Sequence, residues 1–202
     1  MGLESYELLQ EALDRGYFEV ASHSSSHPHP GSYDYDSEIG GCRDEVILNL
    51  DLPYPYRKGS AEYVWCWIEP FGETDDWIQY ALGEYDYLVS RSVDMLWGPT
   101  YFEQWNFDFG LYDRIFTSTY MDVRTASELN SDFDVVYADG GIYHAWGHPG
   151  KSGWEPGGNA YEHIQYVKGK MDVWYVGLGA LYAYDYTRMH VKQVMMDSIS
   201  SS

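Results

Sequence analysis

The chain carries, over residues 17–28, the stretch Tyr17-Phe18-Glu19-Val20-Ala21-Ser22-His23-Ser24-Ser25-Ser26-His27-Pro28. Its first half, residues 17–22, predicts a short strand, and its second half predicts a loop. His23 and His27 are four residues apart, so a helical turn in this loop would direct both imidazoles toward one point. Two neutral imidazole nitrogens are common ligands of a divalent metal ion. The stretch therefore predicts a metal site at the end of a strand.

Helices and strands alternate along the chain on both sides of this stretch. An amphipathic helix over residues 4–15, ended by Gly16, precedes the strand. Further strands are predicted at 61–68, 87–91, 142–148 and 171–176, and helices at 36–50 (interrupted by Gly40-Gly41), 74–84 (with Thr74 as N-cap), 126–138, 159–169 and 178–191. The aromatic segment 97–122 is irregular. Such alternation favours an α/β fold built on a parallel sheet or barrel.

The predicted strands are too few for a closed barrel, which has about eight. The chain also opens with a helix that has no strand before it. We therefore expect a parallel (β/α) barrel-like fold whose first strands are missing, with one domain over residues 1–192 and a frayed tail over 193–202. The sheet edge left by the missing strands would be covered by a second copy of the chain or by another partner.

Composition limits the classes of partner. Among 202 residues, 32 are acidic and 12 basic, which gives a formal charge of −20. This charge repels phosphate backbones, so we expect no nucleic-acid partner, and the apolar stretches are too short for a membrane span. The 21 Tyr and 8 Trp residues fit either a tyrosine-rich core or rings that stack on sugars. Cys42 and Cys66 are either free thiols or one disulfide.

Polar residues follow several predicted strands, where ligands of parallel α/β folds gather. Besides the histidine loop, these are the turns at 69–72 and 91–94 and the pair His148-Pro149. Ordinary structural roles stay open for each: a surface ion pair for Arg91 and Asp94, and a capping or core role for His148. Asp75-Asp76 begins a helix, where carboxylates are favoured by the helix dipole.

The order of these motifs resembles the polysaccharide deacetylase family (NodB homology, carbohydrate esterase family 4). His23-Ser24-Ser25-Ser26-His27 is similar to its His-Ser/Thr-x-x-His metal motif, and Pro70-Phe71-Gly72 to the end of its third motif, although Ile68 stands where that motif has arginine. Arg91-Ser92-Val93-Asp94 is loosely similar to its fourth motif. The apolar strand that ends at His148-Pro149 resembles its fifth motif, and residues 162–175 resemble its closing helix and strand.

The resemblance implies hydrolysis of N-acetyl or O-acetyl groups on an acetylated polysaccharide or oligosaccharide. His23 and His27 would bind a divalent metal, and His148 would protonate the leaving amine, with Asp94 or Arg91 orienting it. The expected ion is zinc, with cobalt or nickel as alternatives. Pro70, Phe71 and Trp146 are the expected substrate contacts. Members of the family are typically secreted or bound to the cell envelope, although no signal segment opens this chain.

The family's first motif, Thr-Phe-Asp-Asp, has no counterpart here. It supplies the catalytic base and the third metal ligand, so its absence leaves three alternatives to a complete deacetylase. The chain could be a non-catalytic carbohydrate-binding or structural relative that has lost the aspartates. It could lack its first strands, supplied by upstream sequence or another chain. It could also be an unrelated metal hydrolase that uses Asp34 or Asp36.

Overall fold

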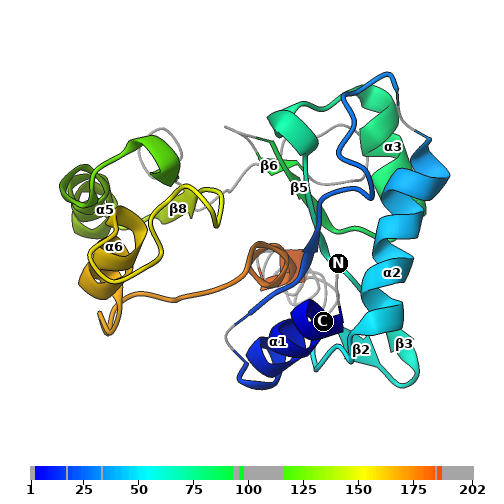
Figure 1. The fold of residues 1–202 in the computed structure, drawn as a ribbon, viewed down its shortest axis with the longest axis horizontal. Helices are drawn as coiled ribbons and strands as arrows, with labels where there is room; N and C mark the ends of the chain where they lie inside the picture. Colours follow the sequence, from blue (N-terminus) through cyan, green and yellow to red (C-terminus); the bar gives the residue numbers. More distant parts are fainter. Residues whose placement is uncertain are drawn as a thin grey trace, which may run out of the picture. The chain divides into compact units, whose positions relative to one another are not determined.

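The computed structural model describes residues 3–16, 18–32, 34–92, 96–97, 116–184 and 186–187. The chain forms two compact units (Figure 1). Unit 1 comprises Met1–Trp105 and Val176–Ser202, and unit 2 comprises Asn106–Tyr175. Within the described residues, none of the helices combines the length and apolar character that crossing a membrane requires.

Unit 1 is built on a four-stranded sheet with the order β1-β4-β5-β6. Strands β1 (Ala21–Ser22), β4 (Cys66–Ile68) and β5 (Val89–Arg91) run parallel, and β6 (Leu96–Trp97) is antiparallel to β5. The register pairs Ser22 with Trp67, and Ile68 with Arg91. The carboxyl ends of the three parallel strands therefore meet at one edge of the sheet. Ligands of parallel α/β folds gather at this edge, which we call the strand-end rule.

Helices and a small hairpin complete unit 1. Their bounds are α1 (Leu3–Asp14), η1 (Asp36–Gly40), α2 (Gly41–Asn49), β2 (Arg57–Lys58), β3 (Ala61–Glu62), η2 (Pro70–Gly72) and α3 (Asp76–Glu84), and residues 178–184 are also helical. The last of these helices is attached to the unit by Glu19, whose carboxylate accepts a hydrogen bond from the backbone N–H of Gly179 at 3.0 Å. Burial raises the pKa of Glu19 to about 7.

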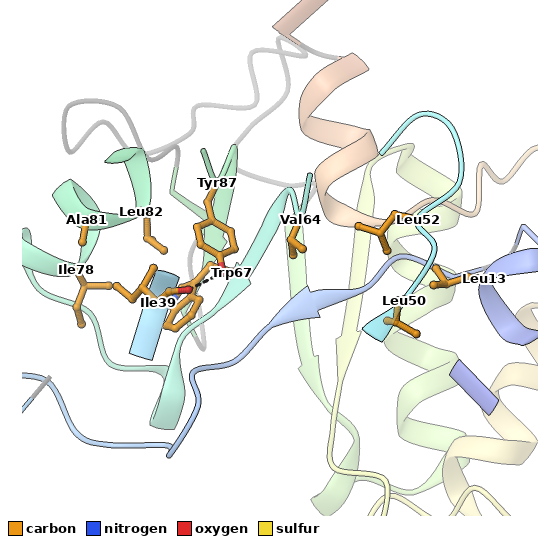
Figure 2. Close-up of a cluster of buried hydrophobic side chains, with 10 residues drawn as sticks. All are labelled: Leu13, Ile39, Leu50, Leu52, Val64, Trp67, Ile78, Ala81, Leu82 and Tyr87. Carbon is orange, nitrogen blue, oxygen red and sulfur yellow. Dashed lines mark hydrogen bonds between the residues drawn. The ribbon is translucent and has the colours of Figure 1, made fainter. Parts of the chain in front are cut away.

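The core of unit 1 lies where α3, η1 and the sheet meet (Figure 2). The indole of Trp67 is fully buried and packs edge-on against Tyr87, with ring centroids 5.6 Å apart. Tyr87 donates a hydrogen bond from its hydroxyl to the carbonyl of Ile39 at 3.2 Å. This bond satisfies a polar group that would otherwise be costly to bury.

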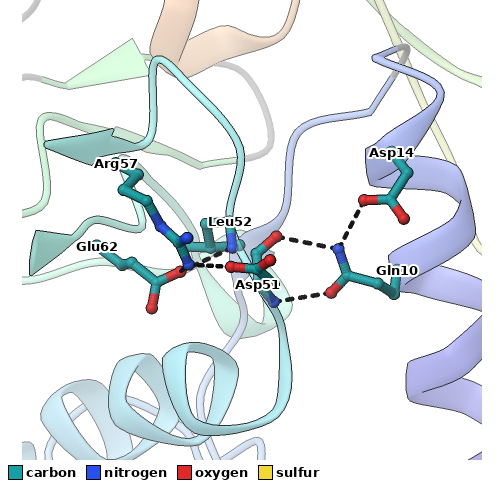
Figure 3. A network of polar contacts seen from close by, with 6 residues as sticks. All are labelled: Gln10, Asp14, Asp51, Leu52, Arg57 and Glu62. Atoms are coloured by element: carbon teal, nitrogen blue, oxygen red, sulfur yellow. Dashed lines mark hydrogen bonds and ion pairs between the residues drawn. The ribbon is translucent and has the colours of Figure 1, made fainter. Parts of the chain in front are cut away.

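A polar network attaches α1 to the segment that follows α2 (Figure 3). The side-chain amide of Gln10 both accepts from the backbone N–H of Asp51 (2.7 Å) and donates to its carbonyl (3.0 Å). Arg57 then bridges the carboxylates of Asp51 and Glu62. Glu62 also accepts from the backbone N–H of Leu52 at 2.8 Å. The loop between α2 and the hairpin is thus fixed by side chains.

Unit 2 is a two-stranded parallel sheet with two helices. Its elements are β7 (Phe116–Tyr120), η3 (Met121–Val123), α5 (Ala126–Asp139), β8 (Ile142–Trp146) and α6 (Asn159–Val167). Helices α5 and α6 lie side by side (Figure 1) and are joined by a hydrogen bond of 2.8 Å between His163 Nδ1 and the amide oxygen of Asn130. A capping box made by Thr125 and Glu128 begins α5. This helix corresponds to the one predicted at 126–138.

Several predicted elements differ in the structure. The strand predicted at 61–68 is two strands, because β3 pairs with β2 in a hairpin whereas β4 joins the parallel sheet. Residues 171–176, predicted as the last strand, are turn and irregular backbone. The hydroxyl of Tyr175 there donates to the carbonyl of Val167 and accepts from the N–H of Lys170, which turns this segment back on α6.

The helix boundaries also need two corrections. Asp75, not Thr74, is the N-cap of α3, and its carboxylate accepts from the N–H of Ile78 at 2.8 Å. Gly40-Gly41 does not interrupt the helix at 36–50 but marks the change from π-helix to α-helix. The parallel sheets agree with an α/β class, and the barrel-like arrangement stays a prediction. Cys42 and Cys66 are both free thiols.

Candidate functional site

The histidine loop leaves β1 in a conformation fixed by its own polar groups. Ser24 and His27 both adopt positive φ angles, 65° and 59°, and the hydroxyl of Ser24 accepts from the N–H of His27 at 2.9 Å. The carboxylate of Glu38, from η1, accepts from the backbone N–H groups of Ser25 (3.0 Å) and Ser26 (2.8 Å). The positive φ angles are sparsely populated for residues other than glycine, so these hydrogen bonds hold an uncommon backbone conformation.

His23 and His27 lie next to each other at the surface, although the loop between them is a bend and not the helical turn that the sequence suggested. Their ring centroids are 4.7 Å apart and their planes are 78° apart. The Nδ1–H of His23 donates to the carbonyl of Ile68 at 2.9 Å, so the neutral form of this ring would carry its lone pair on Nε2. Two imidazoles on one tetrahedral zinc ion have centroids about 5 Å apart when each Zn–N bond is about 2.1 Å. The spacing and the fixed tautomer therefore fit two metal ligands.

Phe71 joins this pair to a third imidazole. Its ring meets that of His27 edge-on at 4.4 Å and stacks on that of His29 at 3.8 Å, with only 8° between the planes. His29 Nδ1 also contacts a carboxylate oxygen of Glu73 at 2.9 Å. Phe71 has a φ of 57° and is 49% exposed, whereas its neighbour Pro70 is buried. Of the two expected substrate contacts in this turn, only Phe71 presents a ring face toward the histidines.

Glu69 is a buried carboxyl group at the end of β4, one residue beyond the carbonyl that holds His23. Its carboxylate accepts from the indole N–H of Trp67 at 2.8 Å and from the side-chain amide of Gln79 at 3.0 Å. Burial raises the pKa of Glu69 to about 7, and the hydrogen bond from Trp67 partly opposes this rise. Because its side chain is inside, Glu69 positions β4 rather than contacting a ligand.

Arg91 ends β5 beside this turn. Its carbonyl accepts from the N–H of Glu69 at 2.9 Å, and its side chain is buried. Asp94 lies outside the described residues, so the positioning role expected of Arg91 and Asp94 stays a prediction. Asp36, an alternative metal ligand, accepts a hydrogen bond from the hydroxyl of Tyr85.

Unit 2 contains a second polar group, centred on Asp122 and His148. Asp122 follows β7 and His148 follows β8, so both leave the carboxyl ends of neighbouring parallel strands. The Nδ1 of His148 is 2.5 Å from one carboxylate oxygen of Asp122, and its backbone N–H donates to the other at 2.9 Å. Tyr120 and Ser152 donate their hydroxyls to the same carboxylate.

The charge state of this pair follows from its hydrogen bonds. Burial alone would raise the pKa of Asp122, but the donors Ser152, His148 and Tyr120 outweigh it and hold the pKa well below the usual range. The side chain of Asp122 is 3% exposed and that of His148 is 55% exposed. An ionised, buried carboxylate thus fixes the Nδ1–H of an exposed imidazole, an arrangement suited to proton transfer through Nε2.

Trp146 lies beside this pair. Its ring stacks on that of Tyr120, its partner across the β7–β8 register, with centroids 4.1 Å apart and planes 15° apart. The two rings lie 6.4 Å and 6.1 Å from the imidazole of His148. An aromatic pair next to an oriented histidine fits the expected role of Trp146 as a substrate contact.

Comparison with known proteins gives no further evidence on these sites. Comparison with protein-family models, with curated proteins and with solved structures finds no match to this chain. In the described part of the chain, no group of three His, Cys, Asp or Glu side chains is placed to hold a metal ion. The metal site predicted from the sequence would therefore have only the two imidazoles of His23 and His27 as ligands.

Sequence reasoning missed two residues of these sites. Asp122 went unnoticed because no strand was predicted before it; with β7 recognised, the strand-end rule would have selected it. Glu69 was seen only as part of a turn, although a glutamate directly after an apolar strand is a signal for a buried carboxyl group.

Proposed function

We propose that the chain is a metal-dependent hydrolase that removes acetyl groups from a carbohydrate polymer. The observation that carries the proposal is the His23–His27 pair, with the Nδ1–H of His23 donating to the Ile68 carbonyl. This arrangement presents neutral imidazoles at the end of a parallel strand, as zinc hydrolases commonly do. The exposed Phe71 ring beside the pair offers an apolar face for a sugar.

His23 and His27, both in unit 1, would hold the metal. A bound divalent ion would supply Lewis-acid polarisation of the acetyl carbonyl and activation of water. In unit 2, the ionised carboxylate of Asp122 accepts from the Nδ1–H of His148, which leaves Nε2 to pass a proton to a ligand bound in this unit. Trp146 would position a sugar ring near this proton.

A second candidate function is non-catalytic binding of a carbohydrate polymer. It is favoured because, among the described residues, no three His, Cys, Asp or Glu side chains are placed to hold a metal ion. Two imidazoles bind a metal ion weakly, whereas the exposed aromatic rings would still bind sugars. The two candidates differ in one measurable outcome, the release of acetate.

The test combines metal analysis with acetate release from acetylated chitooligosaccharides. We expect a titration to show that the protein binds zinc, and the zinc-bound protein to release acetate, and we expect His27→Gln to lose both. His29→Gln is the matched control, because His29 belongs to the same loop and stacks on Phe71 but stands outside the proposed ligand pair. If the protein binds the polymer but releases no acetate, the binding function replaces the proposed hydrolase function. If both variants still bind zinc, His27 is not a metal ligand and the proposed metal site is wrong.

A further inference from the structure

The ammonium group of Lys170, in unit 2, lies among three aromatic rings. Its Nζ is 4.6 Å from the ring centroid of Tyr166, 5.3 Å from that of Tyr137 and 5.7 Å from that of Phe133. A ring face attracts a cation within about 6 Å of its centroid. All three rings meet this limit, so one ammonium interacts with three rings at once.

The rings come from two packed helices. Phe133 and Tyr137 lie one turn apart on α5 and stack with centroids 5.5 Å apart, and Tyr166 on α6 stands perpendicular to Phe133 at 6.3 Å. Phe133 is 5% exposed, whereas Tyr137 and Tyr166 are 43% and 39% exposed. The three rings therefore form a cage with a buried floor and two walls open to solvent.

Contacts other than those with Lys170 hold the cage. Phe133 packs edge-on against Tyr143 at 5.4 Å, deeper in the unit. The hydroxyl of Tyr166 donates to the carboxylate of Asp134 at 2.8 Å, which fixes the ring and places a negative charge at the rim. We therefore expect the rings to keep their arrangement when Lys170 is absent.

Lys170 reaches the cage from the segment after α6. Gly169 has a φ of +76°, which reverses the backbone just before Lys170. The N–H of Lys170 donates to the hydroxyl of Tyr175 at 3.0 Å. Because the ammonium belongs to this short segment and not to a helix, it can leave the rings without disturbing α5 or α6.

We propose that Phe133, Tyr137 and Tyr166 form a binding site for an organic ammonium group, in which Lys170 is the resident occupant. The site recognises a positive charge by three ring faces, and the nearby carboxylate of Asp134 adds attraction. The formal charge of −20 raises the local concentration of cations around the chain. An external ammonium must displace Lys170, so removal of this side chain strengthens binding.

The test is an NMR titration of the full chain with tetramethylammonium and, separately, with protonated glucosamine, both at constant ionic strength set by sodium chloride. We expect Lys170→Ala to bind at least one probe saturably and at least about tenfold more tightly than the unsubstituted chain. Lys170→Met is the matched control, because its apolar chain fills the cage without a charge and should bind neither probe. The two probes distinguish a methylated ammonium from that of an amino sugar.

A second substitution assigns the binding to the cage. Tyr166→Leu in the Lys170→Ala background should abolish it, while circular dichroism shows that the helices persist. The inference is overturned if folded Lys170→Ala binds neither probe, if Lys170→Met binds as well as Lys170→Ala, or if binding survives Tyr166→Leu. Its outcome does not depend on the proposed hydrolase activity, since no acetate is measured.

Discussion

Replacing Glu69 by glutamine should remove a large part of the pH dependence of the stability of unit 1. Glu69 is 1% exposed and lies among Trp67, Gln79 and the end of β5, with a pKa of about 7 in place of the usual 4.5. Between these two values the folded protein keeps the proton and the unfolded chain releases it. The contribution of Glu69 to stability is therefore largest below pH 4.5 and is lost as the pH rises from 4.5 through about 7.

The magnitude follows from the size of this change. At 1.36 kcal/mol per pH unit, moving a pKa from 4.5 to about 7 makes the ionised Glu69 cost about 3 kcal/mol of unfolding free energy above pH 8. Glutamine resembles the protonated acid in shape, and its oxygen can still accept from Trp67. We thus expect Glu69→Gln to lose little stability at pH 5 and to gain as much as about 3 kcal/mol relative to the unsubstituted protein at pH 8.

Amide hydrogen exchange is the suitable assay, because it reports the opening of unit 1 by itself. Exchange of the peptides covering β4 and α3 is measured between pH 5 and pH 8 and corrected for the intrinsic pH dependence of exchange. Glu84→Gln, which makes the same change at an exposed position of α3, controls for the altered net charge. The reasoning fails if the free energies of opening of Glu69→Gln and of the unsubstituted protein keep a constant difference across this range.

Four further substitutions test other parts of the fold. Gly40→Ala should destabilise unit 1 by about 1–3 kcal/mol in urea denaturation, because a Cβ there would lie 2.4 Å from the Tyr85 ring. Gly41→Ala is the control and should be neutral or stabilising, because the nearest atom to its Cβ is 3.6 Å away. Gln10→Ala removes two hydrogen bonds to backbone and should lower the urea midpoint by an amount equivalent to about 1–3 kcal/mol. Asp122→Asn should destabilise unit 2 at pH 7, and progressively less as the pH falls below about 4, as measured by hydrogen exchange of the peptides covering β7 and β8.

The sequence predicted the local structure best where it carries specific end signals. Gly16, predicted to end the first helix, follows α1 with a φ of 75°. The helix predicted at 126–138 forms as α5, and the capping box of Thr125 and Glu128 that begins it is a further signal that the prediction did not use. By contrast, Met171 to Val176 has the β-branched and aromatic residues of a strand but forms none, because the hydroxyl of Tyr175 bonds to backbone groups around the end of α6. Such a side-chain contact leaves no periodic trace in the sequence.

The candidate site was predictable only in part. The strand-end rule selected His23, and the structure explains why it works: the register of β1 with β4 brings the carbonyl of Ile68 within hydrogen-bond distance of its ring. The partner of His148 was not predictable in this way. Asp122 precedes it by 26 residues, and pairing them needs knowledge that β7 and β8 are neighbours.

The two units differ in how ionisation affects their stability. In unit 1, burial raises the pKa of Glu19 and of Glu69 to about 7, so both carboxyl groups favour the folded state at lower pH. In unit 2, hydrogen bonds lower the pKa of Asp122 and burial lowers that of His163, so both groups favour the folded state at higher pH. Acidification from pH 7 toward pH 5 thus adds to the stability of unit 1 through Glu19 and Glu69 and subtracts from that of unit 2 through His163. A single melting temperature for the whole chain would average these opposing contributions, whereas hydrogen exchange of peptides from each unit measures them separately.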